Sequence, residues 1–159
     1  MAKKIINPWL GLTEKGYNCF ACAPTNPYGL KMEFQEDGDD IVCYWNPHTN
    51  FQGWLNTLHG GIQATLLDEI GGWIIARKFQ TSGMTTNLNV KYKKPVPTGD
   101  GVTIEIRAHV KETKRNFVFI EAVISYNGEV CSTAEITYYC FPKDVAEKDF
   151  MFTGCEVEK

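Results

Sequence analysis

The most regular hydrophobic pattern in the chain lies in residues 58–79. Apolar side chains recur there every three or four residues, at Ile62, Leu66, Ile70 and Trp73. This spacing predicts an α-helix that turns these residues toward a core. A helix of about 20 residues is about 30 Å long, which is enough to form the main partner of a whole sheet.

Predicted strands flank this helix on both sides. Before it, the apolar runs LKMEF and DIVCYW are separated by the polar QEDGDD and predict a hairpin. After it, apolar and polar residues alternate in TTNLNVKYKK and VTIEIRAHV. The runs FVFIEAVISY and EVCSTAEITYY flank Asn127-Gly128, a pair typical of two-residue hairpin turns. This order predicts an α+β domain with one long helix against a strongly curved antiparallel sheet.

Length and composition place few other demands on the chain. Its 159 residues fit a single domain over 1–159, of which 43% are hydrophobic and 22% charged. We expect residues 1–30 to be irregular, with a short helix near residues 8–15, and residues 143–159 to form a peripheral tail. The formal charge of −3 argues against a general nucleic-acid-binding surface.

The N-terminus MAKKIINPWLGL has no sustained apolar region and no small-residue cleavage site, so it does not resemble a secretory signal. No apolar run is long enough to span a bilayer. We therefore expect a cytoplasmic protein that does not associate with membranes.

The six cysteines are expected to be thiols. Cys19 and Cys22 have the spacing of half a zinc site or of a redox pair. A structural zinc needs about four ligands, however, and no second close Cys or His pair is present. Redox pairs usually begin a helix, whereas this one leads into the turn-rich APTNPYGL. We interpret the pair as structural and expect no metal.

A second face of the predicted helix carries the candidate chemistry. Gly60, Ala64, Asp68 and Gly72 are four residues apart and share this face. Small residues let a ligand or another backbone approach closely, and helix–helix packing through a small-residue seam is the structural alternative. A carboxylate in a packed seam is costly unless it is paired or solvated. Asp68 is therefore a candidate functional group.

The start of the predicted helix offers a second element, His59-Gly60-Gly61. The first amides of a helix lack intrahelical partners, and the helix dipole makes this end positive. Glycine would let an oxyanion approach those amides, as in an oxyanion hole. The motif alone also fits a simple turn. His59 stands where it could cap the helix or line a site, and both interpretations stay open.

Three stretches in combination resemble the hotdog-fold acyl-CoA thioesterases, in particular the branch related to the phenylacetate-pathway thioesterases. They are CFACAPTNPYGL, LHGGIQATLLDE and TTNLNVKYKKPVPTGD, and with the strand order they cover most of residues 19–140. The resemblance implies a central helix wrapped by a curved antiparallel sheet. It also implies a homodimer or a homotetramer formed as a dimer of dimers. The implied activity is hydrolysis of an acyl-CoA substrate to free acid and CoA, with no metal or other cofactor.

The resemblance also implies roles for individual residues. Asp68 corresponds to the nucleophile or general base, and we favour the general base. Gly60, with Gly61 beside it, corresponds to the amide that binds the thioester carbonyl. Thr85 corresponds to a Ser or Thr that opens the following strand and contributes to substrate binding.

Other substrate-binding candidates are less direct. Many relatives have Asn or Gln seven residues before the first of the paired glycines, where this chain has Gly53. The adjacent Gln52 is then the candidate that orients water or substrate. Lys93 and Lys94 are candidates for binding the phosphates of CoA, although lysines are also common on solvated strand edges.

Two other functions are alternatives to hydrolysis. A hotdog hydratase needs a His beside the acid, and here no His follows the helix acid and no HxxxxPG stretch precedes it. A non-catalytic acyl-CoA-binding or regulatory module is the stronger alternative, although it leaves Asp68 beside the glycine amides without a purpose. The neighbouring Glu69 points about 100° around the helix and is expected to form an ion pair or to contact solvent.

The spacing of the two candidate elements has a geometric consequence. Gly60 and Asp68 are eight residues apart, so they lie about 12 Å apart along one helix. A carbonyl bound at the helix start is too far from Asp68 of the same helix. We therefore predict that each active site combines Gly60 of one subunit with Asp68 of the other, across a two-fold axis.

Overall fold

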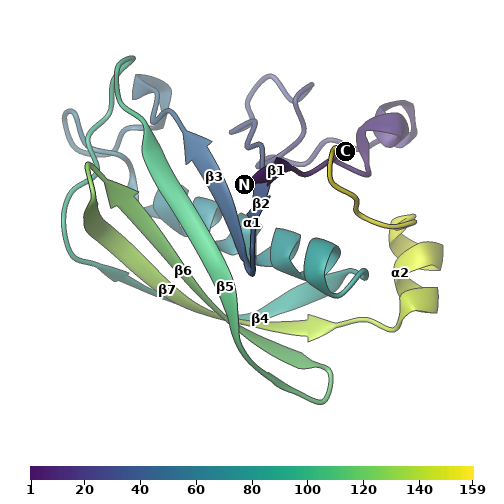
Figure 1. The fold of residues 1–159 in the computed structure, drawn as a ribbon. Coiled ribbons are helices and arrows are strands. Elements are labelled where there is room, and N and C mark those ends of the chain that lie inside the picture. The colour runs from purple at the N-terminus through teal and green to yellow at the C-terminus, as the bar shows by residue number, and fades with distance from the viewer.

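The computed structural model describes residues 1–159 and has one seven-stranded antiparallel sheet that curves around the long helix α1 (Figure 1). The strand order across the sheet is β1-β2-β3-β5-β6-β7-β4. The elements are β1 (Lys3–Lys4), the 3-10 helix η1 (Leu10–Lys15), β2 (Gln35–Asp37), β3 (Asp40–Trp45), the 3-10 helix η2 (Thr49–Phe51), α1 (Gly60–Lys78), β4 (Gly83–Tyr92), β5 (Ile104–Lys114), β6 (Phe117–Tyr126), β7 (Glu129–Cys140) and α2 (Lys143–Phe150).

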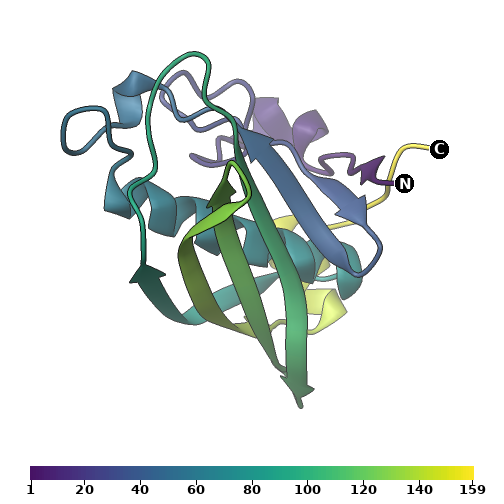
Figure 2. The same ribbon diagram turned by 60° about the vertical axis from the view of Figure 1, so that its left-hand side comes forward.

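Helix α1 lies in the concave face of the sheet, as Figure 2 shows. Its fully buried side chains pack against isoleucines of the central strands β5 and β6. These are Leu66, Leu67, Ile70 and Ile74 on the helix, with Ile104, Ile106, Ile120 and Ile124 on the strands. Fully burying one such side chain contributes about 1.5–3 kcal/mol, so this layer is the main source of stability.

The predicted α+β architecture and its long helix are confirmed, with helix ends within two residues of the expected ones. The hairpin turn between β6 and β7 is also confirmed. Asn127 and Gly128 have φ values of 49° and 76°, the left-handed pair that a tight two-residue turn requires. The buried residues of α1 do not form the single apolar stripe that the spacing of three to four residues predicts. Ile62 is only half-buried, whereas Leu67 and Ile74 on other sides of the helix are fully buried because the sheet and the N-terminal loop enclose it.

The predicted strand at LKMEF is wrong. Leu30, Met32 and Phe34 alternate with exposed residues, as they would in a strand, but the ladder begins only at Gln35. The Met32 amide donates to the Ala21 carbonyl at 2.9 Å, so the backbone of this segment bonds to the N-terminal loop. It contacts the sheet through a side-chain bond, in which the Trp45 indole of β3 donates to the Leu30 carbonyl at 2.7 Å. Alternation in burial alone therefore does not distinguish it from a strand.

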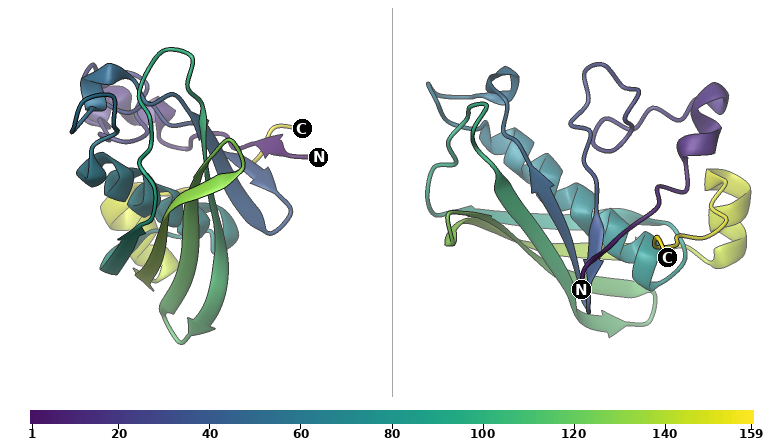
Figure 3. Two further views of the ribbon diagram at one scale, coloured as in Figure 1. Left: turned by 90° about the vertical axis from the view of Figure 1, so that its left-hand side faces the viewer. Right: turned by 45° about the horizontal axis from the view of Figure 1, so that its top comes forward.

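The last residues are less peripheral than their polar composition predicts. Residues 143–150 form α2, and Phe152 and Cys155 beyond it are buried. Arg77 Nη1 and Gln80 Nε2 both donate to the Cys155 carbonyl, each at 2.9 Å. Figure 3 shows η1 and α2 side by side, and their neighbours Trp9 and Phe152 have ring centroids 5.9 Å apart. Two apolar anchors thus fix a mostly polar segment.

The two chain ends lie together, because Ile5 pairs with Val157 in an isolated β-bridge. None of the helices combines the length and apolar character needed to cross a lipid bilayer.

Candidate active site

Asp68 lies half-buried in the middle of α1, facing strand β4. Thr85 Oγ1 donates a hydrogen bond to Asp68 Oδ1 at 2.7 Å. Thr85 lies at an irregularity of β4, where the register with β7 shifts between Thr85 and Asn87. The other carboxylate oxygen, Oδ2, has no hydrogen-bond partner within the chain. The structure therefore brings together the two residues that the sequence placed on separate elements, and it leaves one basic oxygen available.

Tyr138 on β7 is a third member of this group that sequence reasoning missed. Its hydroxyl donates to the backbone carbonyl of Asp68 at 2.7 Å and lies 3.3 Å from Oδ1. Burial and then the charge of Asp68 raise the pKa of Tyr138, so the hydroxyl stays protonated and can donate. The alternation of Ala134, Ile136 and Tyr138 on the inward face of β7 was the available signal.

The same tyrosine explains the second glycine pair of the helix. A Cβ at Gly71 would lie 2.9 Å from Cε2 of Tyr138, and a Cβ at Gly72 would lie 3.4 Å from its hydroxyl. The ring can lie this close to the helix only because both residues lack side chains. We expected the small face at Gly72 to admit a ligand or a second helix. Within one chain, Tyr138 packs against this face, and Gly72 also borders a cavity.

At the helix start, His59 acts as the cap. Its Nδ1 accepts a hydrogen bond from the Gly61 amide at 2.9 Å. The Gly61 amide is therefore engaged in this conformation and is not free to bind a carbonyl oxygen. The Gly60 amide has no hydrogen-bond partner in the chain. Tyr92 of β4 donates to the Gly60 carbonyl at 2.7 Å and fixes this end of the helix against the strand.

Two grooves adjoin Gly60. One, of about 510 Å³, includes Trp54, Tyr92, Lys93 and Lys94. Lys94 also forms an exposed ion pair with Glu129 at 2.8 Å, whereas no ion pair involves Lys93. The two predicted phosphate-binding lysines thus lie beside the predicted carbonyl-binding amide.

The other groove, of about 450 Å³, includes Gln52, Gly53 and His59. Gln52 Oε1 accepts from the Asn56 amide at 3.2 Å, so this oxygen stabilises its own loop. A Cβ at Gly53 would lie 3.2 Å from the Cα of His59. This contact gives a physical reason for the glycine, because a longer side chain here would push the loop away from the helix start.

Asp68 does not border either groove at Gly60. A third cavity of about 440 Å³ adjoins the middle of α1 and includes Glu69, Gly72 and Tyr138, again without Asp68. None of these three cavities therefore contains both the free amide at the helix start and the carboxylate. The one-chain geometry agrees with the separation of about 12 Å expected from helix rise.

Of the two alternatives expected for Glu69, the ion pair is absent, whereas the side chain is partly exposed to solvent. This half-buried carboxylate forms no ion pair, and its Oε1 accepts from Trp73 Nε1 at 3.0 Å and from Cys19 Sγ at 3.6 Å. The N-terminal loop covers this side of α1, which the helical angle alone could not indicate.

Comparison with known proteins finds thioesterases. Residues 55–133 match the family model described as the thioesterase superfamily. Acyl-coenzyme A thioesterase THEM4 of Rattus norvegicus is 33% identical over 78 residues, which is 49% of this chain and 33% of that protein. Acyl-coenzyme A thioesterase 13 of Homo sapiens is 26% identical over 80 residues, covering 50% of this chain and 56% of that protein. The chain thus spans between a third and about half of these relatives.

Solved structures show the same fold. Zebra fish thioesterase superfamily member 2 superposes with a TM-score of 0.65 at 22% identity, over 82% of this chain and 97% of that one. A hypothetical thioesterase protein with coenzyme A from Streptococcus pneumoniae gives 0.64 at 18% identity, over 70% and 90%. The architecture is the hotdog fold, a long helix wrapped by a curved antiparallel sheet. Residues 55–133 thus resemble the thioesterase superfamily, and the whole domain has the fold of its solved members.

Proposed function

We propose that this protein hydrolyses acyl-CoA thioesters to the free acid and CoA. The match of residues 55–133 to the thioesterase superfamily model and the names of the relatives support this activity. The observation that carries the proposal is the Asp68 carboxylate, held through Oδ1 by Thr85 with its Oδ2 unengaged. Gly60 adds an unengaged amide at the positive end of the same helix.

In the proposed reaction Asp68 acts as a general base. Thr85 and Tyr138 orient the carboxylate, and its free oxygen removes a proton from a water that attacks the thioester carbonyl. The Gly60 amide stabilises the negative oxygen that develops on the tetrahedral intermediate. Collapse of this intermediate breaks the carbon–sulfur bond and releases CoA. A single turnover in heavy-oxygen water distinguishes the alternative, because label entering Asp68 would indicate an anhydride and a nucleophilic role.

We further propose that the active site forms between two subunits. Strand β4 is the last strand of the sheet and pairs only with β7, which leaves one edge of ten residues unpaired. Such an edge favours pairing with another strand. Near one end of β4, Thr85 contacts Asp68, and at its other end Tyr92 contacts Gly60.

A second copy added antiparallel to this edge would pair the two β4 strands about a two-fold axis. With the axis near Leu88, Thr85 of one subunit lies opposite the partner subunit's Tyr92. This arrangement carries Asp68 toward the partner subunit's Gly60 and supports a homodimer as the active unit. Assembly into a tetramer, the cytoplasmic location and the phenylacetate-related branch stay predictions.

The substrate would approach along the groove that contains Gly60. Lys93 and Lys94 lie there and are the proposed partners of the CoA phosphates. His59 holds the helix start in shape, and Gln52 borders the second groove, from which it would contact the bound substrate or water.

The test is thiol release from a panel of acyl-CoA substrates. We expect Asp68→Asn to lower kcat by about 10²- to 10⁴-fold, as is typical for loss of a general base, while KM changes little. Asp39→Asn is the matched control, because Asp39 lies exposed in the turn between β2 and β3. Near-wild-type turnover by Asp68→Asn would refute the assignment. Tight acyl-CoA binding without hydrolysis by the wild type would favour the non-catalytic binding module.

A further inference from the structure

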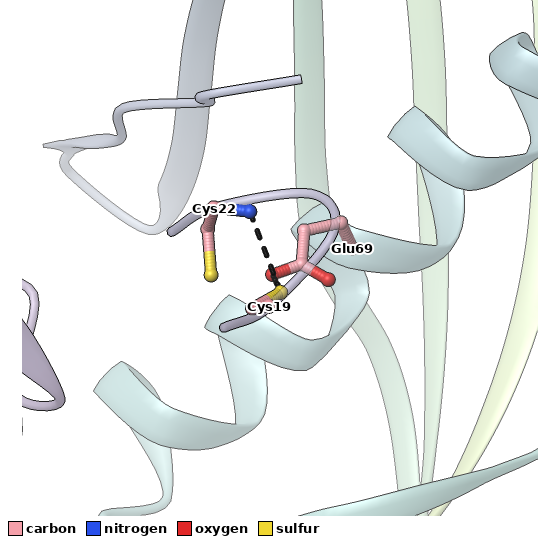
Figure 4. Close-up of side chains that lie close together, drawn as sticks. All are labelled: Cys19, Cys22 and Glu69. Atoms are coloured by element: carbon pink, nitrogen blue, oxygen red, sulfur yellow. Dashed lines mark hydrogen bonds between the residues drawn. The ribbon is translucent and has the colours of Figure 1, made fainter. Parts of the chain in front are cut away.

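Three metal-ligand side chains converge beside α1, on a different side from the proposed active site (Figure 4). Cys19 and Cys22 come from the N-terminal loop, and Glu69 comes from the middle of the helix. Their ligand atoms all lie within 4.8 Å of one another, and Cys19 Sγ is 3.6 Å from Glu69 Oε1. Cys22 is buried, and the other two residues are half-buried.

No positively charged side chain accompanies this cluster. No Lys, Arg or His forms an ion pair with Glu69, whose partners are the indole N–H of Trp73 and the thiol of Cys19. A half-buried carboxylate is costly without a compensating charge. Its nearest neighbours are two thiols, which add further negative charge when they lose their protons. A divalent cation would neutralise two of the three negative charges that these groups carry when all are ionised.

We propose that Cys19, Cys22 and Glu69 bind Zn²⁺. Two sulfurs and a carboxylate oxygen are ordinary zinc ligands, and in a tetrahedral site such atoms lie about 3.4–3.8 Å apart. The 3.6 Å separation of Cys19 Sγ and Glu69 Oε1 already has this value. The remaining separations are below 4.8 Å and need only small side-chain rotations. The sequence does not indicate this site through a second Cys or His pair, because the third ligand, Glu69, follows Cys19 by 50 residues.

Neighbouring groups orient each ligand. The Cys22 amide donates to Cys19 Sγ at 3.4 Å, and Tyr17 Oη lies 3.1 Å from Cys22 Sγ. Trp73 Nε1 holds the carboxylate of Glu69 at 3.0 Å. Such outer contacts fix ligand geometry in metal sites.

The three ligands leave a fourth coordination position. All three border the cavity of about 440 Å³ beside α1, so the open position faces this cavity and would hold water or a small ligand. The bound ion would join the N-terminal loop to the helix next to Asp68. The site stands independently of the acyl-CoA activity, because it uses none of the residues proposed for hydrolysis.

The test is zinc titration of the full chain, stripped with a chelator and kept reduced by a phosphine. We expect one equivalent of Zn²⁺ to bind, and Co²⁺ to give a thiolate charge-transfer band and the strong visible bands of tetrahedral cobalt. Loss of a ligand should cost at least the 10–100-fold typical of an outer contact, so Cys19→Ser, Cys22→Ser and Glu69→Gln should each bind at least about tenfold more weakly. Cys140→Ser is the control, a half-buried thiol of β7 outside the cluster.

Folding is checked separately from binding. Zinc in excess should raise the Tm of the wild type and of Cys140→Ser, and at the same zinc concentration it should raise the Tm of Cys19→Ser by less. A variant that is destabilised but folded can still be assessed, because the comparison is between its Tm with and without zinc. The proposal is overturned if the reduced wild type binds no zinc, or if the three ligand variants bind it as tightly as the wild type. The proposal is also overturned if Cys19 and Cys22 form a disulfide and the reduced protein binds no zinc, which would indicate a redox pair.

Discussion

Subunit complementation tests the proposed two-subunit site most directly. One variant, Asp68→Asn, keeps the shape of the side chain and removes its basicity. The other, Gly60→Val, blocks the amide at the helix start. A Cβ at Gly60 would lie 3.5 Å from the Tyr92 ring, an ordinary contact, so the first carbon fits and the methyl groups beyond it occupy the place of the carbonyl. Each variant alone should be inactive.

The expected recovery follows from two-fold symmetry. Co-refolding equal amounts of the two variants makes about half of the dimers mixed, and in each mixed dimer one site receives both an intact Gly60 and an intact Asp68. About one quarter of the wild-type activity should therefore return. A site within one subunit gives a different result, because every site in every dimer then carries one defect and no activity returns.

The assay is thiol release from an acyl-CoA that the wild type hydrolyses. Mixed dimers are separated by different affinity tags on the two variants, and their composition is verified by mass spectrometry before the assay. A co-refolded wild-type sample sets the value for full recovery. Verified mixed dimers that remain inactive would refute the shared site and, with it, the two-subunit explanation for the spacing of Gly60 and Asp68.

Three further predictions concern the surroundings of the helix. Thr85→Val removes a hydrogen bond to a carboxylate, worth about 1.5–3 kcal/mol, so kcat/KM should fall by about 10- to 100-fold, while Thr85→Ser should recover most of it; equal rates for Val and Ser would show that the hydroxyl is not needed. Gly71→Ala should lower the free energy of unfolding by about 1 kcal/mol in urea titrations, because overpacking against Tyr138 exceeds the gain in helix propensity. Gly72→Ala should lower it by less, and a Gly71→Ala variant more stable than the wild type would contradict this packing. Burial opposes ionisation of Glu36, but hydrogen bonds from Lys78 and Arg77 outweigh it and lower the pKa of this carboxyl. Its contribution to stability is therefore present above the ordinary Glu pKa and is lost as the pH falls through the lowered value, so the difference in unfolding free energy between the wild type and Glu36→Gln should shrink in acid.

The fold was largely predictable because its strongest signals are local. Periodicity over residues 58–79 marked α1, and Asn127-Gly128 marked a turn whose backbone needs two left-handed residues. The errors occurred where nonlocal contacts decide the outcome. The backbone around Met32 bonds to Ala21 and not to a neighbouring strand. Cys155 is buried, and its carbonyl accepts a hydrogen bond from Arg77 at the end of α1.

The candidate site was predictable to the extent that one helix carries it. Helical spacing put Gly60 and Asp68 on one face, and the resemblance indicated Thr85, which the structure places 2.7 Å from the carboxylate. Tyr138 was missed because its position depends on how β7 crosses the helix, 70 residues later in the chain. The loss of the Gly61 amide to His59 was also unpredictable, since capping and site lining need the same residue at the same place.

The neighbouring acids of α1 show how one helix can contribute to two separate sites. Asp68 and Glu69 differ by about 100° in direction, which is enough to reach different layers of the molecule. Asp68 points to strand β4, where a hydroxyl orients it and where we propose that a second subunit pairs with the free sheet edge. Glu69 points to the N-terminal loop, where two thiols meet it. A helix enclosed on several sides therefore needs no single polar face. Each half-buried acid contacts groups of the element that covers its own side of the helix.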